Sequence, residues 1–239
     1  MKDSSSFSFN PIGYVESCFK QKFGIPRQPG LVPSARGRLI LLPEYSHPDI
    51  IRGLSAYSHI WIIFVFHQSI QEKFKNTVRP PRLGGNERMG VFATRSNFRP
   101  NPIGQSVVML EKVDMENDRI VLSLSGIDIL DKTPVLDIKP YITYSDYVEK
   151  ASAGFAFKAP EKQFTVSFSA MAENCLQQLM SKDSKHLKTL ITEVLSYDPR
   201  PAYETNKENH KIYSMQLYDY DVKWRVEGEE AMVEEIVKR

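Results

Sequence analysis

Two absences narrow the class of this protein: cysteines are few, and long apolar runs are missing. The 239 residues include two cysteines, Cys18 and Cys175, whereas secreted disulfide scaffolds are dense in cysteine. The longest apolar run, Ile60–Phe66, has the length of a strand and is too short to cross a bilayer. The N-terminal residues lack the hydrophobic core of a signal peptide. We therefore expect a cytoplasmic protein that does not interact with a membrane.

Several short catalytic motifs are also missing. No GxGxxG follows a strand, so a Rossmann cofactor site has no support, and no GxxxxGK[ST] loop is present to hold phosphates. A GxSxG nucleophile elbow is absent as well. The five histidines show none of the spacings with cysteines or acids that metal ligands have, so no metal site is expected. These absences disfavour hydrolases, NTPases and zinc enzymes.

Acidic residues are scarce in two segments of a chain whose net charge is only +2. Ser17–Pro43 contains five basic residues and no acid, and Lys73–Leu110 contains seven basic residues against Glu87 alone. Concentrated positive charge in a nearly neutral chain indicates a polyanionic partner, and nucleic acid is the obvious candidate. The alternative is a solvated basic surface with no partner, which fits Lys73 and Lys75 better than the arginines that follow.

Those arginines lie in an unusual stretch, Arg79–Leu110, which reads RPPRLGGNERMGVFATRSNFRPNPIGQSVVML. Proline and glycine restrict or redirect the backbone, so the guanidinium groups between them should be held in set directions. A second rigid turn, KFGIPRQPGL, places Arg27 and Gln28 between two prolines. A guanidinium beside an amide can grip a carboxylate or a purine edge. The alternative for both stretches is a purely structural role, as a stiff loop whose side chains face solvent.

The local patterns predict a mainly β fold. Short β-branched or aromatic runs separated by Gly, Pro, Asn and Asp fill the chain up to about Tyr147, which favours a barrel or sandwich over a doubly wound sheet. A short helix is expected over Pro48–Tyr57 and a strand over Gly90–Thr94. After a linker, the pattern predicts one strand, two amphipathic helices (Met171–Met180 and His186–Leu195) and further strands. We therefore expect a β-barrel domain over residues 1–150 and a smaller α+β domain over 151–239.

Two further clusters carry polar groups of chemical interest. Asp128, Asp131 and Asp137 alternate with apolar residues in a strand-turn-strand pattern. They can pair with the arginines structurally, bind a ligand cation or act as a base. In DPRPAY, Arg200 lies between prolines near Tyr203, and an arginine beside an aromatic ring can clamp a base or a phosphate. The alternative for DPRPAY is a turn that ends the preceding helix.

Taken together, these segments resemble one family. KFGIPRQPGL, RPPRLGGNERMGVFATRSNFRPNPIG and DILDKTPVLDIKPY look like the signature motifs of the tRNA methyltransferases with a TsaA-like or VirR-like domain. DPRPAY resembles the corresponding element of bacterial members that have a second domain. The resemblance implies N6-methylation of threonylcarbamoyladenosine beside the anticodon. It also implies a β-barrel that binds S-adenosylmethionine without a Rossmann sheet, and a homodimer with the cofactor near the subunit contact.

The resemblance also implies the site residues. The expected cofactor contacts are Pro26, Arg27, Gln28, His67, Gln68, Arg95, Gln105, Ile129, Leu130, Asp131 and Lys132. The expected contacts with the tRNA anticodon arm are Arg99, Asn101, Arg200 and Tyr203.

The chemistry of the methylated nitrogen suggests one catalytic role. A ureido nitrogen is a weak nucleophile because its lone pair is delocalised, so transfer requires close placement and loss of the N–H proton. Asp131 is the first candidate for the base that accepts this proton. Two other classes stay open at this point: an RNA-binding module without catalysis, and a methyltransferase that acts on a small molecule or a protein.

Overall fold

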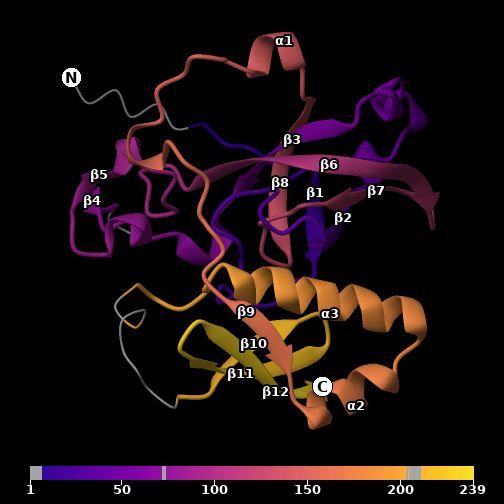
Figure 1. Ribbon diagram of the computed structural model, residues 1–239. Coiled ribbons are helices and arrows are strands. Elements are labelled where there is room, and N and C mark those ends of the chain that lie inside the picture. Colours follow the sequence, from indigo (N-terminus) through magenta and orange to yellow (C-terminus); the bar gives the residue numbers. More distant parts are fainter. Residues whose placement is uncertain (1–6, 72–73, 203, 205–210) are drawn as a thin grey trace.

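The computed structural model describes residues 7–71, 74–202, 204 and 211–239. Tyr203, one of the expected tRNA contacts, lies outside the described residues. Within them the chain forms a six-stranded closed barrel and, after it, a region of two helices and a four-stranded sheet. Figure 1 shows the barrel above and the C-terminal region below, with α3 running along the boundary. None of the described helices has the length and apolar character to span a membrane.

The barrel is antiparallel throughout, with neighbours in the order β1-β2-β7-β6-β3-β8. Its inside is apolar because the strands alternate. In β3, Ile60, Ile62 and Phe64 are buried, whereas the residues between them face outward and are half-buried. Burial of this inner set supplies the main favourable term for closing the barrel. The barrel strands are β1 (Gly13–Ser17), β2 (Arg36–Leu41), β3 (His59–Val65), β6 (Ile103–Glu116), β7 (Arg119–Ser125) and β8 (Thr133–Pro140).

The region after the barrel joins helices to a mostly antiparallel sheet in the order β10-β11-β12-β9, in which β9 pairs parallel with β12. Ser169 caps α2, since its side chain accepts a hydrogen bond from the amide of Ala172. The buried face of α3 presents Leu187, Leu190, Ile191 and Val194 to the core. The elements are β9 (Thr165–Phe168), α2 (Ala170–Gln177), α3 (Ser181–Ser196), β10 (Tyr213–Leu217), β11 (Tyr220–Glu227) and β12 (Glu230–Lys238).

The barrel and the C-terminal region share one hydrophobic core. Phe19, which follows β1, forms a backbone bridge with Leu217 of β10, and both side chains are fully buried. Further along the chain, both the amide and the hydroxyl of Ser34 donate to Glu193 of α3. The segment between these anchors is therefore fixed by contacts from both parts of the molecule. The expected division of the chain at residue 150 stays a prediction.

Two local predictions are wrong. The expected helix over Pro48–Tyr57 is a pair of short 3-10 helices, because Gly53 adopts φ 85° between them and interrupts regular hydrogen bonding. The expected strand over Gly90–Thr94 is also absent. A two-residue strand, β5 (Met89–Gly90), pairs with β4 (Thr77–Val78), and the chain then turns into a 3-10 helix over Val91–Ala93. A further short helix, α1 (Thr143–Asp146), follows the last barrel strand.

Gly104 permits close packing at the start of β6, and we expect its replacement by alanine to destabilise the fold. A Cβ atom there would lie 2.4 Å from the ring of Phe64, which also packs edge-to-face against Phe66 at 5.1 Å. The clash should lower the free energy of unfolding by about 1–2 kcal/mol, net of the gain from stiffening the unfolded chain. Urea denaturation followed by circular dichroism measures the loss. Gly90→Ala is the matched control, since a Cβ at Gly90 has no heavy atom within 4 Å; equal effects would contradict the packing argument.

Candidate active site

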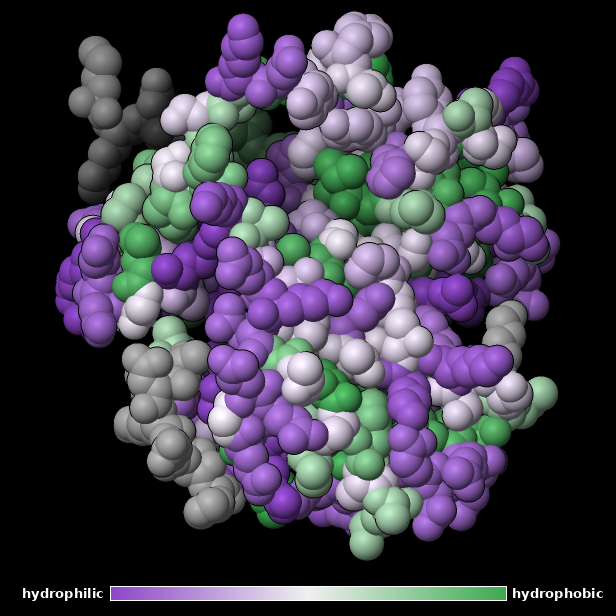
Figure 2. Space-filling model, viewed as in Figure 1, coloured by the Kyte–Doolittle hydropathy of each residue, from purple (hydrophilic) through white to green (hydrophobic). Residues whose placement is uncertain are grey.

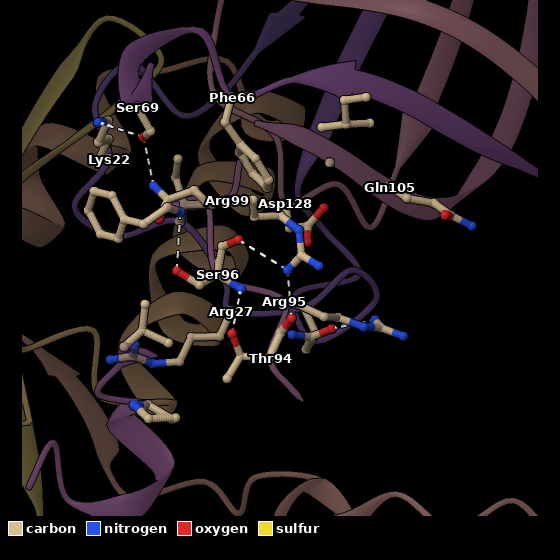
Figure 3. Close-up of a pocket in the computed structure, with 18 of the residues that line it drawn as sticks. Lys22, Arg27, Phe66, Ser69, Thr94, Arg95, Ser96, Arg99, Gln105 and Asp128 are labelled. Atoms are coloured by element: carbon tan, nitrogen blue, oxygen red, sulfur yellow. Dashed lines mark hydrogen bonds between the residues drawn. The ribbon is translucent and has the colours of Figure 1, made fainter. Parts of the chain in front are cut away.

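A cavity of about 1460 Å³ opens at one end of the barrel. Its walls come from the turn after β1, the residues after β3, the segment containing β4 and β5, the loop before β6 and the connection between β7 and β8. Figure 3 shows side chains around this hollow from the turn after β1, the residues after β3, the loop before β6 and the connection between β7 and β8. Of the expected cofactor contacts, this cavity is lined by Pro26, Arg27, Gln28, His67, Gln68, Arg95, Gln105 and Leu130.

Ser69 ties three of these segments together. Its hydroxyl accepts hydrogen bonds from Lys22 Nζ at 3.1 Å and from Asn97 Nδ2 at 2.7 Å. Lys22 also donates to the backbone carbonyl of Gln68 at 2.7 Å. Because Lys22, Ser69 and Asn97 come from different loops, these bonds fix the loops relative to one another, as Figure 3 shows. A fixed set of loops gives a preorganised site.

Of the two arginines expected to hold the cofactor, Arg95 is anchored by a hydrogen bond and Arg27 is partly buried near a carboxylate. Arg95 Nη1 donates to Gln28 Oε1 at 2.6 Å, which joins the loop before β6 to the turn after β1. Partial burial lowers the pKa of Arg27, and the nearby carboxylate of Asp198 opposes that shift. Asp198 belongs to the C-terminal region, so that region also contributes to the electrostatics of the cavity.

Arg99 organises the loop that carries Arg95. Its Nη1 donates to the carbonyl of Thr94 at 2.7 Å and makes longer hydrogen bonds to the carbonyls of Val91 and Ser96. The guanidinium also lies over the ring of Phe92, 5.8 Å from its centre, and Phe92 itself is 76% exposed. Arg99 lines the cavity, and its expected contact with tRNA stays a prediction.

His67 and Gln68 lie between this cavity and a smaller one of about 350 Å³. Burial lowers the pKa of His67 from its ordinary 6.5, although a hydrogen bond to the carbonyl of Val65 partly opposes the shift. The imidazole is therefore neutral at pH 7, and one ring nitrogen can accept a hydrogen bond. Its Nδ1 lies 3.5 Å from Thr133 Oγ1.

Asp131, the expected base, lines the smaller cavity together with Lys132. Its Oδ1 forms an ion pair with Lys20 at 3.0 Å and accepts a hydrogen bond from the amide of Ser17 at 2.8 Å. The carboxylate therefore already has two partners within the protein. Its role as a base stays a prediction.

The remaining expected residues lie apart from the cavity. Ile129 is 1% exposed and belongs to the core. Asn101 is exposed and does not line the cavity. Arg200 is 4% exposed and is held by Asp198, through Nε to Oδ1 at 2.8 Å and Nη2 to Oδ2 at 2.9 Å. Contacts of these residues with a ligand stay predictions.

The site also includes residues that are not among the expected contacts, one of which, Asp128, is among the three aspartates that the sequence offered as a cation ligand or a base. Asp128 lines the large cavity, and Ser106 of β6 donates a hydrogen bond to its Oδ1 at 2.6 Å. Burial raises the pKa of Asp128 to about 6, against the opposing effects of Ser106 and Arg95. Phe66 and Trp61 add aromatic surface. Phe66 directly follows β3 and Asp128 comes shortly after β7, and site residues often gather at strand ends. Trp61 lies within β3 and carried no such signal.

Among the described residues, no cluster of three or more His, Cys, Asp or Glu side chains is arranged to hold a metal ion. The cavity instead offers guanidinium groups, amides, aromatic rings and one carboxylate. Such a donor set suits an organic ligand that carries both an anionic group and a heteroaromatic ring. Fold and site together define a β-barrel protein with a cationic, loop-lined ligand site, a class distinct from the Rossmann enzymes.

Comparison with known proteins gives the particular family. Residues 14–147 match the tRNA-methyltransferase O N-terminal domain, and residues 161–239 match the TrmO C-terminal domain. The protein belongs to the tRNA-methyltransferase O family, as the motifs had indicated.

The curated relatives and solved structures agree with this assignment. The chain is 50% identical over 224 residues to the tRNA (adenine(37)-N6)-methyltransferase of Escherichia coli, covering 93% of this chain and 94% of the relative. It is 48% identical over 217 residues to a putative S-adenosylmethionine-dependent methyltransferase of Pseudomonas aeruginosa, covering 91% of each. The crystal structure of TrmO from Pseudomonas aeruginosa superimposes with a TM-score of 0.79 at 39% identity, covering 98% of this chain and 99% of that one.

Proposed function

We propose that this protein transfers the methyl group of S-adenosylmethionine to N6 of adenine 37 of tRNA, the reaction named for its Escherichia coli relative. We propose further that the substrate adenine carries the threonylcarbamoyl group. The observation that carries the proposal is a single cavity in which anchored arginines, amides and aromatic rings converge beside one carboxylate. When bound, S-adenosylmethionine supplies an electrophilic methyl group on a sulfonium.

The residues of the cavity fit the cofactor. The guanidinium groups of Arg27 and Arg95 suit its carboxylate, and the side-chain amide of Gln28 suits the edge of adenine. His67, neutral at pH 7, adds no charge beside the sulfonium. The expected cofactor contacts of Pro26, Gln68, Gln105 and residues 129–132 belong to the same proposal.

The wall of the cavity formed around β4 and β5 suits tRNA. Lys75, Arg79, Arg82 and Arg88 line the cavity there, and Arg82 is braced by a hydrogen bond to the backbone carbonyl of Lys158. Lys75 also lies over the ring of Phe98, 4.6 Å from its centre. Cations beside an aromatic ring can track phosphates and stack an unpaired base of the anticodon loop.

Methyl transfer to two tRNA pools tests the proposed function. One pool carries threonylcarbamoyladenosine, the other is unmodified, and S-adenosylmethionine carries the labelled methyl group. Incorporation into the first pool alone is expected. Incorporation into neither pool, with the cofactor still bound, would remove this substrate, and failure to bind the cofactor would leave an RNA-binding module. Transfer should also weaken steeply with salt because cations on the protein replace counterions of the RNA.

We propose that the protein acts as a homodimer in the cytoplasm. After His59, the outward side chains of β3 are apolar (Trp61, Ile63 and Val65), although an antiparallel strand with one solvated face would carry polar ones. Trp61 lies opposite Val107 and Val65 opposite Ile103 of β6, so the apolar surface continues onto the next strand. In Figure 2, hydrophobic residues lie exposed over the part of the barrel where Figure 1 draws β3, β6 and β8.

Both cysteines are free thiols, which suits the reducing environment of the cytoplasm.

A second copy on this face would also cover the cavity, since Trp61, Ile103 and Gln105 belong to both surfaces. Replacing Met109 by aspartate should therefore raise the dimer dissociation constant by about tenfold or more, because a charge would be buried in an apolar contact. Sedimentation velocity over a concentration series measures it. Met115→Asp is the matched control, on the same strand and exposed to a similar degree (49% against 46%). A monomeric wild type, or equal effects of the two variants, would contradict this interface.

A further inference from the structure

One carboxylate faces many cations in the large cavity. Asp128 is the sole acidic residue among the described residues that line it, against eight basic ones: Lys22, Arg27, Lys75, Arg79, Arg82, Arg88, Arg95 and Arg99. A cavity built only to hold anions has no use for a carboxylate, which repels them. The binding of carboxylate and phosphate groups therefore does not explain why Asp128 lies in this cavity, and another role is needed.

The fold holds Asp128 in place on two sides. Gly126, with φ 68°, turns the chain directly after β7, and Ile127 and Ile129 on either side of Asp128 are both 1% exposed. These two anchors in the core leave the intervening side chain facing the cavity, as Figure 3 shows. On the cavity side, the buried hydroxyl of Ser106 donates to Asp128 Oδ1 at 2.6 Å.

The contrast with Asp131 is informative. Asp131 Oδ1 is engaged by the ammonium of Lys20 and the amide of Ser17. Asp128 accepts one hydrogen bond from another described side chain, and forms no ion pair with any residue that the structure describes. A carboxylate without an ion pair is the better proton acceptor, because protonation breaks no salt bridge.

We propose that Asp128 is the proton acceptor of methyl transfer and that Ser106 positions it, an inference that rests on the proposed function. The N6–CH3 bond forms as the S–CH3 bond breaks, and the electrons of the broken bond stay on sulfur. The proton on N6 moves to Oδ2 of Asp128. The sulfonium charge and the carboxylate charge disappear together, so atoms and charges balance with no further reactant.

The electrostatics of the site suit this role. With its pKa raised to about 6, Asp128 is ionised at neutral pH yet holds a proton more strongly than an ordinary aspartate. General bases work best when their pKa lies near the working pH. The proton then returns to solvent before the next turnover. Arg95 is the charged neighbour that acts most on Asp128, and His67, whose pKa burial lowers from its ordinary value, is a second titratable group that lines the cavity.

Three aspartate-to-asparagine variants test the assignment: Asp128→Asn, Asp131→Asn and Asp118→Asn. Asp118 is an exposed turn residue at φ 60°, a conformation that asparagine tolerates, so Asp118→Asn is the control. Asp128→Asn should lower the single-turnover rate by about 10²-fold or more while S-adenosylmethionine affinity, measured by calorimetry, changes by less than about threefold. Asp131→Asn should lower the rate less than Asp128→Asn.

The pH dependence of the rate separates Asp128 from His67. The wild-type rate should fall below about pH 6, and Asp128→Asn should abolish this fall. Ser106→Ala should move it to higher pH, because the lost hydrogen bond had favoured the ionised form. Carbon-13 NMR of labelled aspartate in the free protein should show one carboxyl that titrates near pH 6 and is missing in Asp128→Asn.

Three results would overturn the inference. If Asp128→Asn keeps the wild-type rate and pH profile, another group accepts the proton. If it loses cofactor affinity in proportion to rate, Asp128 acts in binding the sulfonium and takes no proton. If the wild type transfers no methyl group to either tRNA pool, the proposed function fails and this assignment fails with it.

Discussion

Replacing Arg200 by methionine should lower the free energy of unfolding by about 3–5 kcal/mol, because it leaves the carboxylate of Asp198 buried without its partner. The two side chains are 4% and 5% exposed. The guanidinium makes two parallel hydrogen bonds to the carboxylate and lies over the ring of Phe164, 5.1 Å from its centre. Burial lowers the pKa of Arg200, but the bonds to Asp198 outweigh it and raise the pKa overall.

Urea denaturation of the full chain, followed by circular dichroism, measures this loss. The control is the double variant Asp198→Asn with Arg200→Met, in which both members of the buried pair are uncharged. Asparagine tolerates the φ of 45° at position 198 and can still accept the hydrogen bond that the Arg200 amide donates to Oδ1. We expect the double variant to be more stable than Arg200→Met alone. If the single variant loses less than about 1 kcal/mol, the pair contributes little to the fold.

Asp128→Asn should have the opposite effect to Arg200→Met and raise the free energy of unfolding at neutral pH. Burial raises the pKa of Asp128 from 3.8 to about 6, so the folded state binds this proton more tightly than the unfolded state does. Above about pH 6 the ionised carboxylate therefore costs stability, on the order of 2–3 kcal/mol. As the pH falls from about 6 towards 3.8 the cost disappears, because the carboxyl becomes protonated in both states.

Free energies of unfolding at about pH 7.5 and at about pH 4 measure this difference between wild type and variant. The introduced asparagine retains an oxygen for the Ser106 hydroxyl, so the loss of charge is the principal change. Asp118→Asn, at an exposed position, should leave stability unchanged at both pH values. If Asp128→Asn destabilises the fold at the higher pH, the carboxylate is held by favourable contacts and costs the fold nothing. A residue whose removal stabilises the fold is one retained for function.

The fold was largely predictable because several strands alternate clearly between buried and outward residues. In β3 and in the first half of β6, buried and outward residues follow each other with period two, and turn residues mark the ends. The 3-10 helices could not be predicted, because amino-acid helix propensity does not distinguish a short α-helix from a single 3-10 turn. Gly53 and its φ of 85° decide that case. The outward apolar residues of β3 were visible in the sequence, although the sequence alone did not show which face they occupy.

The site was predictable at the level of loops, less so at the level of single residues. The two proline-rich segments contribute Arg27 and Arg95 to the lining of the cavity, and their contacts with a ligand stay predictions. The choice between Asp128 and Asp131 depends on the short connection from β7 to β8, and on where its residues enter the core. The sequence offered Arg200 as a clamp for a base or a phosphate or as part of a turn, whereas the structure pairs it with the buried carboxylate of Asp198 two residues earlier. Such pairings depend on tertiary contacts that local patterns do not encode.

The shared core has an evolutionary consequence. Phe19 is buried against the bridge to Leu217, and Gly24 lies close to Met215 of β10. A descendant that lost the C-terminal region would expose Phe19 to water and would free the turn that holds Arg27. We therefore expect the barrel of this chain to depend on the C-terminal region for its stability. A stable barrel without the C-terminal region would therefore require polar substitutions at these contact positions.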